Sequence, residues 1–568
     1  MARVTKPLPT AQPAGREPSQ DYSEKPYILE TVDSFASSST YVEAYGPSGL
    51  TGLFASSHVA VCTAFSAIGG LILGYDQGII SVILTMGHFH DSFPDVADTA
   101  PGSGFLKGLM TAMITLGAAL GALNVGWMSD AYSRKYTIVF AVVLFTIGSA
   151  LQVAAVDYAM LVVARFISGV GVGLLSTVVP LYISEISPAE TRGTLLVFQR
   201  ISIVVGIIVA YWITFGTRYI SNDWSWRLPF LLQIIPGLVL GAGAILLPFS
   251  PRWLANQNRE TECLRTLSRL RQLPPTDRRV ESEWLDILAE ARSQQQVLIE
   301  RHSSIMHPTL IHKVRLELAS WTDCFKGGCW RRTVIASGIT FFQQFVGINA
   351  LIYYSPMLFA KMGLDHNMEL QMSGVLNIMQ LVGIITSVWT LDTVGCRKLL
   401  LFGSMAMLTC HVLVAAFVGR FSGDWAAHSA EGWVSVAFLL VFTFIYGCSW
   451  GPVGSAMPAE IFPSSLRAKG VATAAFLNWI ANFVIGIITP PLIQTTTSGT
   501  YIFFAIFCAI AYVFAFYCVP ETQGLTVEEV DQIFRDSTGA VDQDRKRRVL
   551  EEVRKSAVDG VASRLMEA

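Results

Sequence analysis

Residues 342–354, FQQFVGINALIYY, decide how this chain folds, because they place polar side chains deep inside a long apolar run. The run begins after Arg331 and Arg332. At about 1.5 Å per helical residue, Gln343 and Gln344 lie about 16–20 Å into a hydrocarbon layer about 30 Å thick, close to its middle. Carboxamides buried there without partners are costly. The segment therefore predicts a membrane-spanning helix with a polar site halfway along it.

The three carboxamides of this segment, Gln343, Gln344 and Asn349, would not share one face of an unbroken helix. Gly347 lies between them and predicts a local break, a device that forms binding sites near the membrane midplane. A carboxamide both donates and accepts hydrogen bonds, which suits a ligand rich in hydroxyl groups. The alternative is that these side chains tie neighbouring membrane helices together. We favour a binding site and keep the second interpretation open.

The composition places the whole chain in a membrane. Its 568 residues are 52% hydrophobic and only 14% charged, whereas soluble domains average about 25% charged residues. The net charge of −2 argues against a nucleic-acid partner. The nine cysteines form neither a disulfide framework nor a metal-ligand array, so no cofactor or metal is expected. The sequence shows no nucleophile–base arrangement of the kind that would indicate an enzyme.

Twelve apolar runs, each long enough or nearly long enough to span a membrane, predict an all-α polytopic protein. They lie near residues 59–84, 106–128, 136–156, 158–182, 195–217, 228–248, 333–359, 371–391, 399–419, 433–457, 470–493 and 501–519. The predicted organisation is a disordered tail, a six-helix bundle, a linker with helices, a second six-helix bundle and a second tail, over residues 1–57, 58–250, 251–331, 332–520 and 521–568. Within the linker, residues 280–300 predict a charged surface helix.

The orientation follows from the charges of the links. Basic residues gather in the central linker (Arg265, Arg269, Arg271, Arg278 and Arg279) and in two short links (Arg134 and Lys135, and Arg397 and Lys398). The link between the first two runs instead carries the acidic residues Asp91, Asp95 and Asp98. The positive-inside rule places both tails and the linker in the cytosol. No apolar segment opens the chain as a cleavable signal peptide would. We expect a multi-pass protein of the plasma membrane that acts as a monomer among lipids.

The two halves of the chain repeat their polar motifs at an offset of roughly 260–275 residues, the mark of an internal duplication. The second and eighth runs are followed by one motif and the fourth and tenth by another: Asp130 and Arg134 correspond to Asp392 and Arg397, and Glu185 and Arg192 to Glu460 and Arg467. Such carboxylates and arginines can form ion pairs that hold the cytosolic ends of the halves together. Alternatively, the arginines only anchor the membrane ends.

These motifs resemble those of the sugar porter family of the major facilitator superfamily, especially its fungal members. The resemblance covers about residues 60–530 and includes Ile167-x-Gly169-Val170-x-x-Gly173 with Tyr182, Glu185 and Arg192, Pro520-Glu521-Thr522-Gln523-Gly524, and Gln343-Gln344 with Gly347-Ile348-Asn349. It implies two pseudo-symmetric six-helix bundles. It also implies import of a monosaccharide, a hexose or pentose, together with a proton by alternating access.

The resemblance assigns roles to individual residues. Sugar hydroxyls would bind Gln343, Gln344 and Asn349, with further contacts from Asn478, Trp479 and Asn482 of the eleventh run and from Asn377 or Gln380 of the eighth, depending on how that run is aligned. Trp479 can also be an ordinary packing residue. The gate would involve a flexible break at Gly451 and Pro452, together with Tyr353 and Tyr354.

A buried acid raises the question of proton coupling. Asp76 lies inside the first run and Arg165 lies at a similar depth in the fourth, so the two can pair. An acidic side chain at such depth needs a partner or a function. Proton-coupled members of the family carry an acid here, which favours symport. The alternatives are a static Asp–Arg pair, an uncoupled carrier, or a sensor that does not transport.

The fifth run departs from the family pattern. Where members have glutamine six residues before a glycine, counting back from Gly206 leads to Arg200, with Gln199 beside it. Either Gln199 takes the place of the family's glutamine, or the Arg200 cation faces the transport pathway. A cation there would suit a sugar acid or a quinate-like polyol acid. We favour a third account, in which Arg200 extends to the cytosolic headgroups. Two further departures are Ser455 in place of tryptophan and Ser133 in place of glycine.

Overall fold

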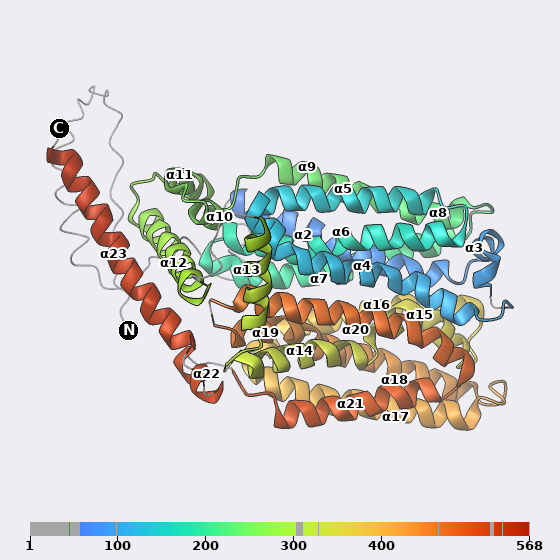
Figure 1. Cartoon of the computed structure of the whole chain (residues 1–568). Coiled ribbons are helices and arrows are strands. Elements are labelled where there is room, and N and C mark those ends of the chain that lie inside the picture. The colour runs from blue at the N-terminus through green and yellow to red at the C-terminus, as the bar shows by residue number, and fades with distance from the viewer. Residues whose placement is uncertain are drawn as a thin grey trace, which may run out of the picture. The chain divides into compact units, whose positions relative to one another are not determined.

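The computed structural model describes residues 45, 57–97, 99–302, 310–327, 329–463, 465–522, 527–534, 536 and 538–566 of the chain. Regular secondary structure in these ranges is entirely helical (Figure 1). Twelve spans are long and apolar enough to cross a membrane, and they coincide with the twelve runs of the sequence to within a few residues at each end. All twelve belong to one compact unit, Ala44–Val553. The predicted tail of residues 1–57 lies almost wholly outside the described residues.

The first six spans form one bundle, and the loop after the first span adds two short helices, α3 (Gly87–Ser92) and η2 (Pro94–Val96). The spans are α2 (Ser57–Ile83), α4 (Ser103–Tyr132), α5 (Arg134–Val153), α6 (Tyr158–Ile186), α7 (Ala189–Thr217) and the pair α8 (Trp224–Leu232) and α9 (Ile234–Leu246).

The linker contains four helices, of which the sequence predicted one. They are α10 (Pro251–Asn256), α11 (Glu260–Arg271), α12 (Arg278–His302) and α13 (Leu310–Asp323). The predicted helix of residues 280–300 is α12. Ser250 begins α10 because its hydroxyl accepts a hydrogen bond from the Trp253 amide and Pro251 occupies the first helical position.

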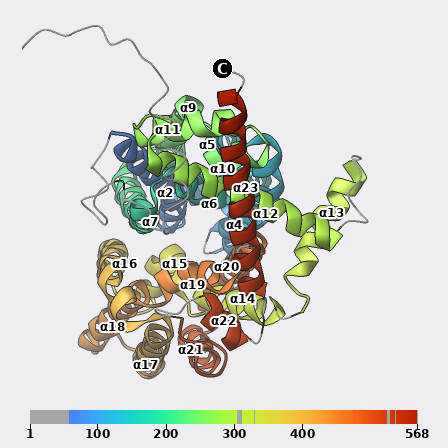
Figure 2. The same ribbon diagram turned by 90° about the vertical axis from the view of Figure 1, so that its left-hand side faces the viewer.

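The last six spans form the second bundle, in which two spans are broken helices. The elements are α14 (Cys329–Phe345) with α15 (Ile348–Ala360), α16 (His366–Val394), α17 (Cys396–Phe421), α18 (Ser429–Cys448) with α19 (Trp450–Ile461), α20 (Arg467–Thr495) and α21 (Gly499–Tyr517), followed by α22 (Val527–Phe534) and α23 (Thr538–Met566). Seen along the helix axes, the two bundles lie side by side, with α20 next to α4 and α16 next to α7 (Figure 2).

The internal duplication is visible in the backbone. Ser133, before α5, has φ 97° and ψ 156°, and Gly395, before α17, has φ 93° and ψ 151°. Both precede helices that begin the third span of their bundle. The conformation suits glycine, so Ser133 occupies a glycine position of the repeat.

Glycines of the sequence signature let α4 and α6 touch. A Cβ on Gly169 would lie 2.2 Å from the carbonyl oxygen of Ile114, and one on Gly173 would lie 2.1 Å from that of Ala118. Small residues four apart commonly allow such close contact between membrane helices. The spacing therefore reports helix packing inside the first bundle.

The two ends of the bundles differ in how the halves meet. We call the end that carries α10–α13 the linker end and the opposite one the α3 end (Figure 1). At the α3 end the halves are joined directly: the Tyr211 hydroxyl donates to the Leu370 carbonyl at 2.6 Å, and Arg218 donates to Asn367 at 2.7 Å. At the linker end, the ion pair of Lys469 with Glu317 reaches the second bundle from a linker helix.

Candidate functional site

The break between α14 and α15 is where the sequence predicted it. Gly347 has φ 103° and precedes α15, so its left-handed backbone ends one helix and starts the next. Because the helices change direction there, Gln343 and Gln344 before the break and Asn349 after it can face one space. All three are buried.

Gln344 and Asn349 belong to one hydrogen-bonded group. The Asn349 amide donates to the Gln344 carbonyl oxygen, and the Gln344 amide donates to Asn478 of α20 at 2.7 Å. The sequence placed these residues in one site, and the structure brings them together from three helices, α14, α15 and α20. Gln343 points instead to the second break, where its amide donates to the carbonyls of Trp450 and Gly451, both at 3.0 Å.

The break in the tenth span lies at Ser449, just before the predicted Gly451 and Pro452. Ser449 has φ −122° and ψ −83° and separates α18 from α19. Gln343 therefore connects the two broken helices. This contact fits the interpretation of interhelical ties and also makes Gln343 sensitive to any movement of α19.

The next turn of α20 carries a link toward the first bundle. Asn482 donates to the Tyr353 hydroxyl at 3.3 Å. Asp76 and Arg165 of the first bundle lie near enough for their charges to act on that hydroxyl. Tyr354 donates to the Gly486 carbonyl at 2.7 Å. The two tyrosines predicted to gate the pathway thus lie where α15 meets α20 and α2.

Asp76 and Arg165 face each other without forming an ion pair. They are 2% and 1% exposed, and the charge of Arg165 acts on Asp76. No contact within 4.0 Å joins them among the described residues. Arg165 donates to the Met110 carbonyl at 2.9 Å, while one Asp76 oxygen and one Arg165 nitrogen are buried without a hydrogen-bond partner. The expected pair is separated in this conformation.

The other residues predicted to contact the substrate differ in their surroundings. Asn377 and Gln380 lie three residues apart on α16, and the side-chain oxygen of each is buried without a partner among the described residues. Trp479 packs into the hydrophobic core of the first bundle, which supports its packing role. Gln199 is buried and Arg200 is exposed.

Ion pairs form inside the first bundle, whereas the sequence predicted pairs that hold the two halves together. Arg134 contacts Glu185 at 3.0 Å and Asp130 at 2.8 Å. In the second bundle, Arg397 donates to the Phe516 carbonyl at 2.7 Å.

The other residues of this set make hydrogen bonds inside the second bundle. Glu460 accepts from Thr522 at 2.8 Å, and Arg467 donates to the Phe462 carbonyl at 3.4 Å. The side chains of Arg192 and Asp392 lie outside the described part of the chain.

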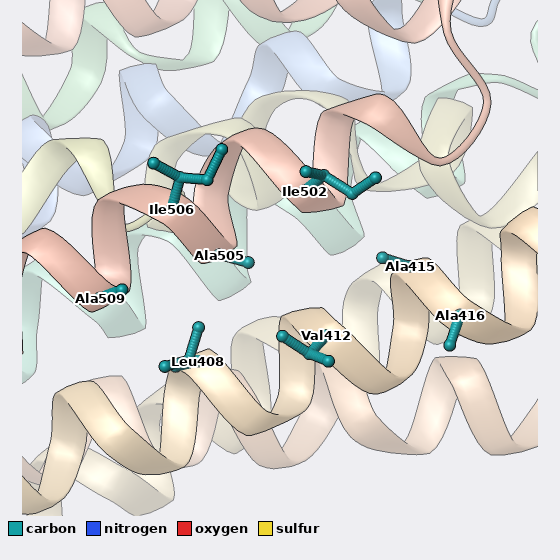
Figure 3. Close-up of a pocket in the computed structure, with 8 residues that line it drawn as sticks. All are labelled: Leu408, Val412, Ala415, Ala416, Ile502, Ala505, Ile506 and Ala509. Atoms are coloured by element: carbon teal, nitrogen blue, oxygen red, sulfur yellow. The ribbon is translucent and has the colours of Figure 1, made fainter.

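A groove between α17 and α21 is a different kind of feature. Figure 3 shows its lining, which is entirely aliphatic: Leu408, Val412, Ala415, Ala416, Ile502, Ala505, Ile506 and Ala509. Val412, Ile502 and Ile506 are among the exposed large hydrophobic residues. A surface of this composition suits acyl chains rather than a polar ligand. No group of His, Cys, Asp or Glu able to hold a metal occurs among the described residues.

Comparison with known proteins decides the family. The family model for sugar (and other) transporters matches residues 62–534. The chain belongs to the sugar transporter family. It is therefore a multi-pass membrane protein of a transporter family and not an enzyme.

Two relatives of this transporter-family protein differ in function. It is 30% identical to the probable glucose transporter rco-3 of Neurospora crassa, over 83% of this chain and 78% of that one. It is 31% identical to the high glucose sensor RGT2 of Saccharomyces cerevisiae, over 84% of this chain but only 61% of the longer relative.

Among solved structures, the xylose transporter XylE of E. coli in a partially occluded inward-open conformation has a TM-score of 0.67 at 23% identity, over 83% of this chain and 100% of that one. The likeness confirms the major facilitator fold.

Two residues of the transporter's site were missed by sequence reasoning. Tyr446 of α18 lies close to Gln343 and near enough to Arg200 for the charge of that arginine to act on its hydroxyl. His411 of α17 contacts the Val346 carbonyl at the α14–α15 break. A polar residue within an apolar run was the available signal for both.

Proposed function

We propose that this protein imports a monosaccharide with a proton by alternating access across the plasma membrane, with the linker end in the cytosol. The observation that carries the proposal is a connected set of polar residues between the two bundles. It runs from Gln344 to Asn478, and one turn further along α20 from Asn482 to Tyr353, which faces Asp76. The proposed sugar site and Asp76 of α2 are therefore linked through Asn482 of α20 and Tyr353 of α15.

The sugar would bind by exchanging hydrogen bonds within the group. The Gln344–Asn349 and Gln344–Asn478 bonds can be replaced by bonds to ligand hydroxyls, since each carboxamide donates and accepts. The free oxygens of Asn377 and Gln380 accept further hydroxyl donors. A buried acceptor without a partner costs about 1–3 kcal/mol, so a ligand that satisfies it gains affinity.

The proton would bind Asp76. A carboxylate held away from water is harder to keep charged when it lacks a hydrogen bond than when it contacts a guanidinium. The separation of Asp76 from Arg165 therefore fits a proton-accepting state, and their approach fits release. Tyr353 connects this change to the sugar site, so that sugar and proton stabilise the same conformation.

During the transport cycle, closure would alternate between the α3 end and the linker end of the protein. The structure is joined at the α3 end by the bonds of Tyr211 with Leu370 and of Arg218 with Asn367. Outward opening requires these bonds to break, and the breaks at Gly347 and Ser449 are the points where α15 and α19 can turn. The ion pair of Arg134 with Glu185 would hold the linker end of the first bundle through the cycle.

The test is sugar uptake with a proton readout. In yeast lacking hexose transport, growth on single carbon sources identifies the sugar, and purified protein in liposomes then measures accumulation under an imposed pH gradient. We expect accumulation above equilibrium and acidification of the lumen on sugar entry. Uptake that stops when the sugar concentrations are equal on both sides, and that a protonophore does not change, would indicate an uncoupled carrier.

A second candidate is a sugar sensor, favoured by the 31% identity to RGT2 over 84% of the chain. Sugar binding without uptake, in protein that reaches the membrane, would establish it.

A further inference from the structure

Arg200 is the strongest unexplained feature of the molecule. It lies on α7, seven residues into the span Gly193–Thr217, which is about 10 Å from its start. Its side chain is exposed although protein atoms surround it. Both observations hold only if Arg200 borders a water-accessible space inside the protein, because a lipid-facing side chain would lack protein on one side.

The direction of the side chain is shown by its neighbour. Tyr446 of α18, in the other bundle, lies near enough for the charge of Arg200 to act on its hydroxyl. Tyr446 in turn interacts with Gln343. Arg200 is therefore placed on the side of α7 that is near the other bundle and the carboxamide site.

The charge of Arg200 is not compensated by the protein. No ion pair or hydrogen bond of its guanidinium occurs among the described residues, whereas Arg134 has two carboxylate partners. An intramembrane cation that faces a cavity without a carboxylate commonly marks the path of an anion. Arginine also suits carboxylates because its planar fork donates two parallel hydrogen bonds.

Hydroxyl-binding groups adjoin this cation. Gly447, which follows Tyr446, packs on the backbone carbonyl of Gln380, so Gln380 lies at the contact of α16 with α18. Its side-chain oxygen has no hydrogen-bond partner among the described residues. Gln343 completes the set from α14. A ligand seated here would meet one positive charge at one end and hydroxyl-binding carboxamides along the rest.

We infer that the protein transports a polyhydroxylated carboxylic acid, such as a hexuronic acid, with the carboxylate on Arg200 and the hydroxyls on Gln343 and Gln380. This inference rests on the proposed function and names its substrate class. It also carries a charge balance: a monoanion entering with one proton moves no net charge, whereas a neutral hexose entering with one proton moves one positive charge.

The experiment uses glucose and glucuronate, which differ only at C6, with full-length protein in liposomes. A pH gradient and a membrane potential are imposed separately. We expect glucuronate uptake to respond to the pH gradient and not to the potential. Arg200→Gln should weaken inhibition of glucose uptake by glucuronate at least tenfold, Arg200→Lys should weaken it less, and Arg420→Gln, an exposed cation at the end of α17, should leave it unchanged.

The outcomes separate the two proposals. The inference would be overturned if glucose uptake is proton-coupled but glucuronate neither inhibits it nor is itself transported. It would also be overturned if glucuronate inhibits wild type and Arg200→Gln equally. Either result would leave the proposed function standing. Absence of proton movement with either molecule would overturn the proposed function itself. Glucuronate-induced thermal stabilisation of wild-type protein but not of Arg200→Gln, each monodisperse in detergent, guards against a variant that merely misfolds.

Discussion

Replacement of His411 tests whether the break in the seventh span needs a hydrogen bond from a neighbouring helix. His411 is 1% exposed, and its Nε2 lies 3.1 Å from the carbonyl oxygen of Val346. Because a carbonyl only accepts, Nε2 carries the proton. The break at Gly347 interrupts the helical hydrogen bonds, and no backbone N–H donates to Val346 among the described residues. His411 therefore supplies the donor that the break removes.

The magnitude follows from this geometry. In His411→Phe the ring that packs 4.5 Å from Phe442 and 5.7 Å from Phe504 is kept, and only the donor is lost. An unsatisfied buried carbonyl costs about 1–3 kcal/mol. If that cost falls on the sugar-binding conformation of the break, affinity falls by about 5–150-fold. His411→Gln can still donate to Val346 and should lose less.

The assay is the concentration dependence of sugar uptake at matched surface amounts, together with the thermal midpoint of purified protein. We expect a raised KM in His411→Phe and partial recovery in His411→Gln. An unchanged KM in His411→Phe would refute the positioning role. Equal loss of thermal stability in both variants with an unchanged KM would reduce His411 to a packing residue.

Three further predictions concern coupling and stability. Asp76→Asn should abolish accumulation, which one coupled proton sets at about tenfold per pH unit, while sugar exchange across the membrane persists; retained pH-driven accumulation would contradict the coupling role. Ser133→Gly relieves a backbone strain of about 1–3 kcal/mol and should raise the thermal midpoint in detergent, whereas a lower midpoint would show that the serine hydroxyl matters more. Arg134→Gln leaves Glu185 buried without its guanidinium, at a cost of about 3–5 kcal/mol; expression and thermal midpoint should fall well below those of the exposed control Arg420→Gln, and equal values would contradict the importance of the pair.

The break at Gly347 shows how far local chemistry reaches. Three carboxamides and a glycine inside one apolar run were enough to predict a broken span and a polar site, and the structure places the break there. The Ser250-Pro251 start of α10 was likewise encoded locally, in a cap and a first-turn proline. Partners on other helices were beyond such reasoning: Asn478 lies 134 residues from Gln344, and its contact depends on how α20 is rotated.

The sequence by itself determined the twelve spans, their duplication and the broken seventh span, because hydrophobic length, motif repetition and glycine conformation are properties of contiguous residues. Only the tertiary structure decided that Arg200 lies near Tyr446 of the other bundle, that the side-chain oxygens of Asn377 and Gln380 have no partner among the described residues, and that Asp76 stands apart from Arg165. Each of these depends on the rotation and spacing of helices from different parts of the chain. Rotation is set by packing, and a change of one residue in register turns a side chain by about 100°, from the cavity to the lipid.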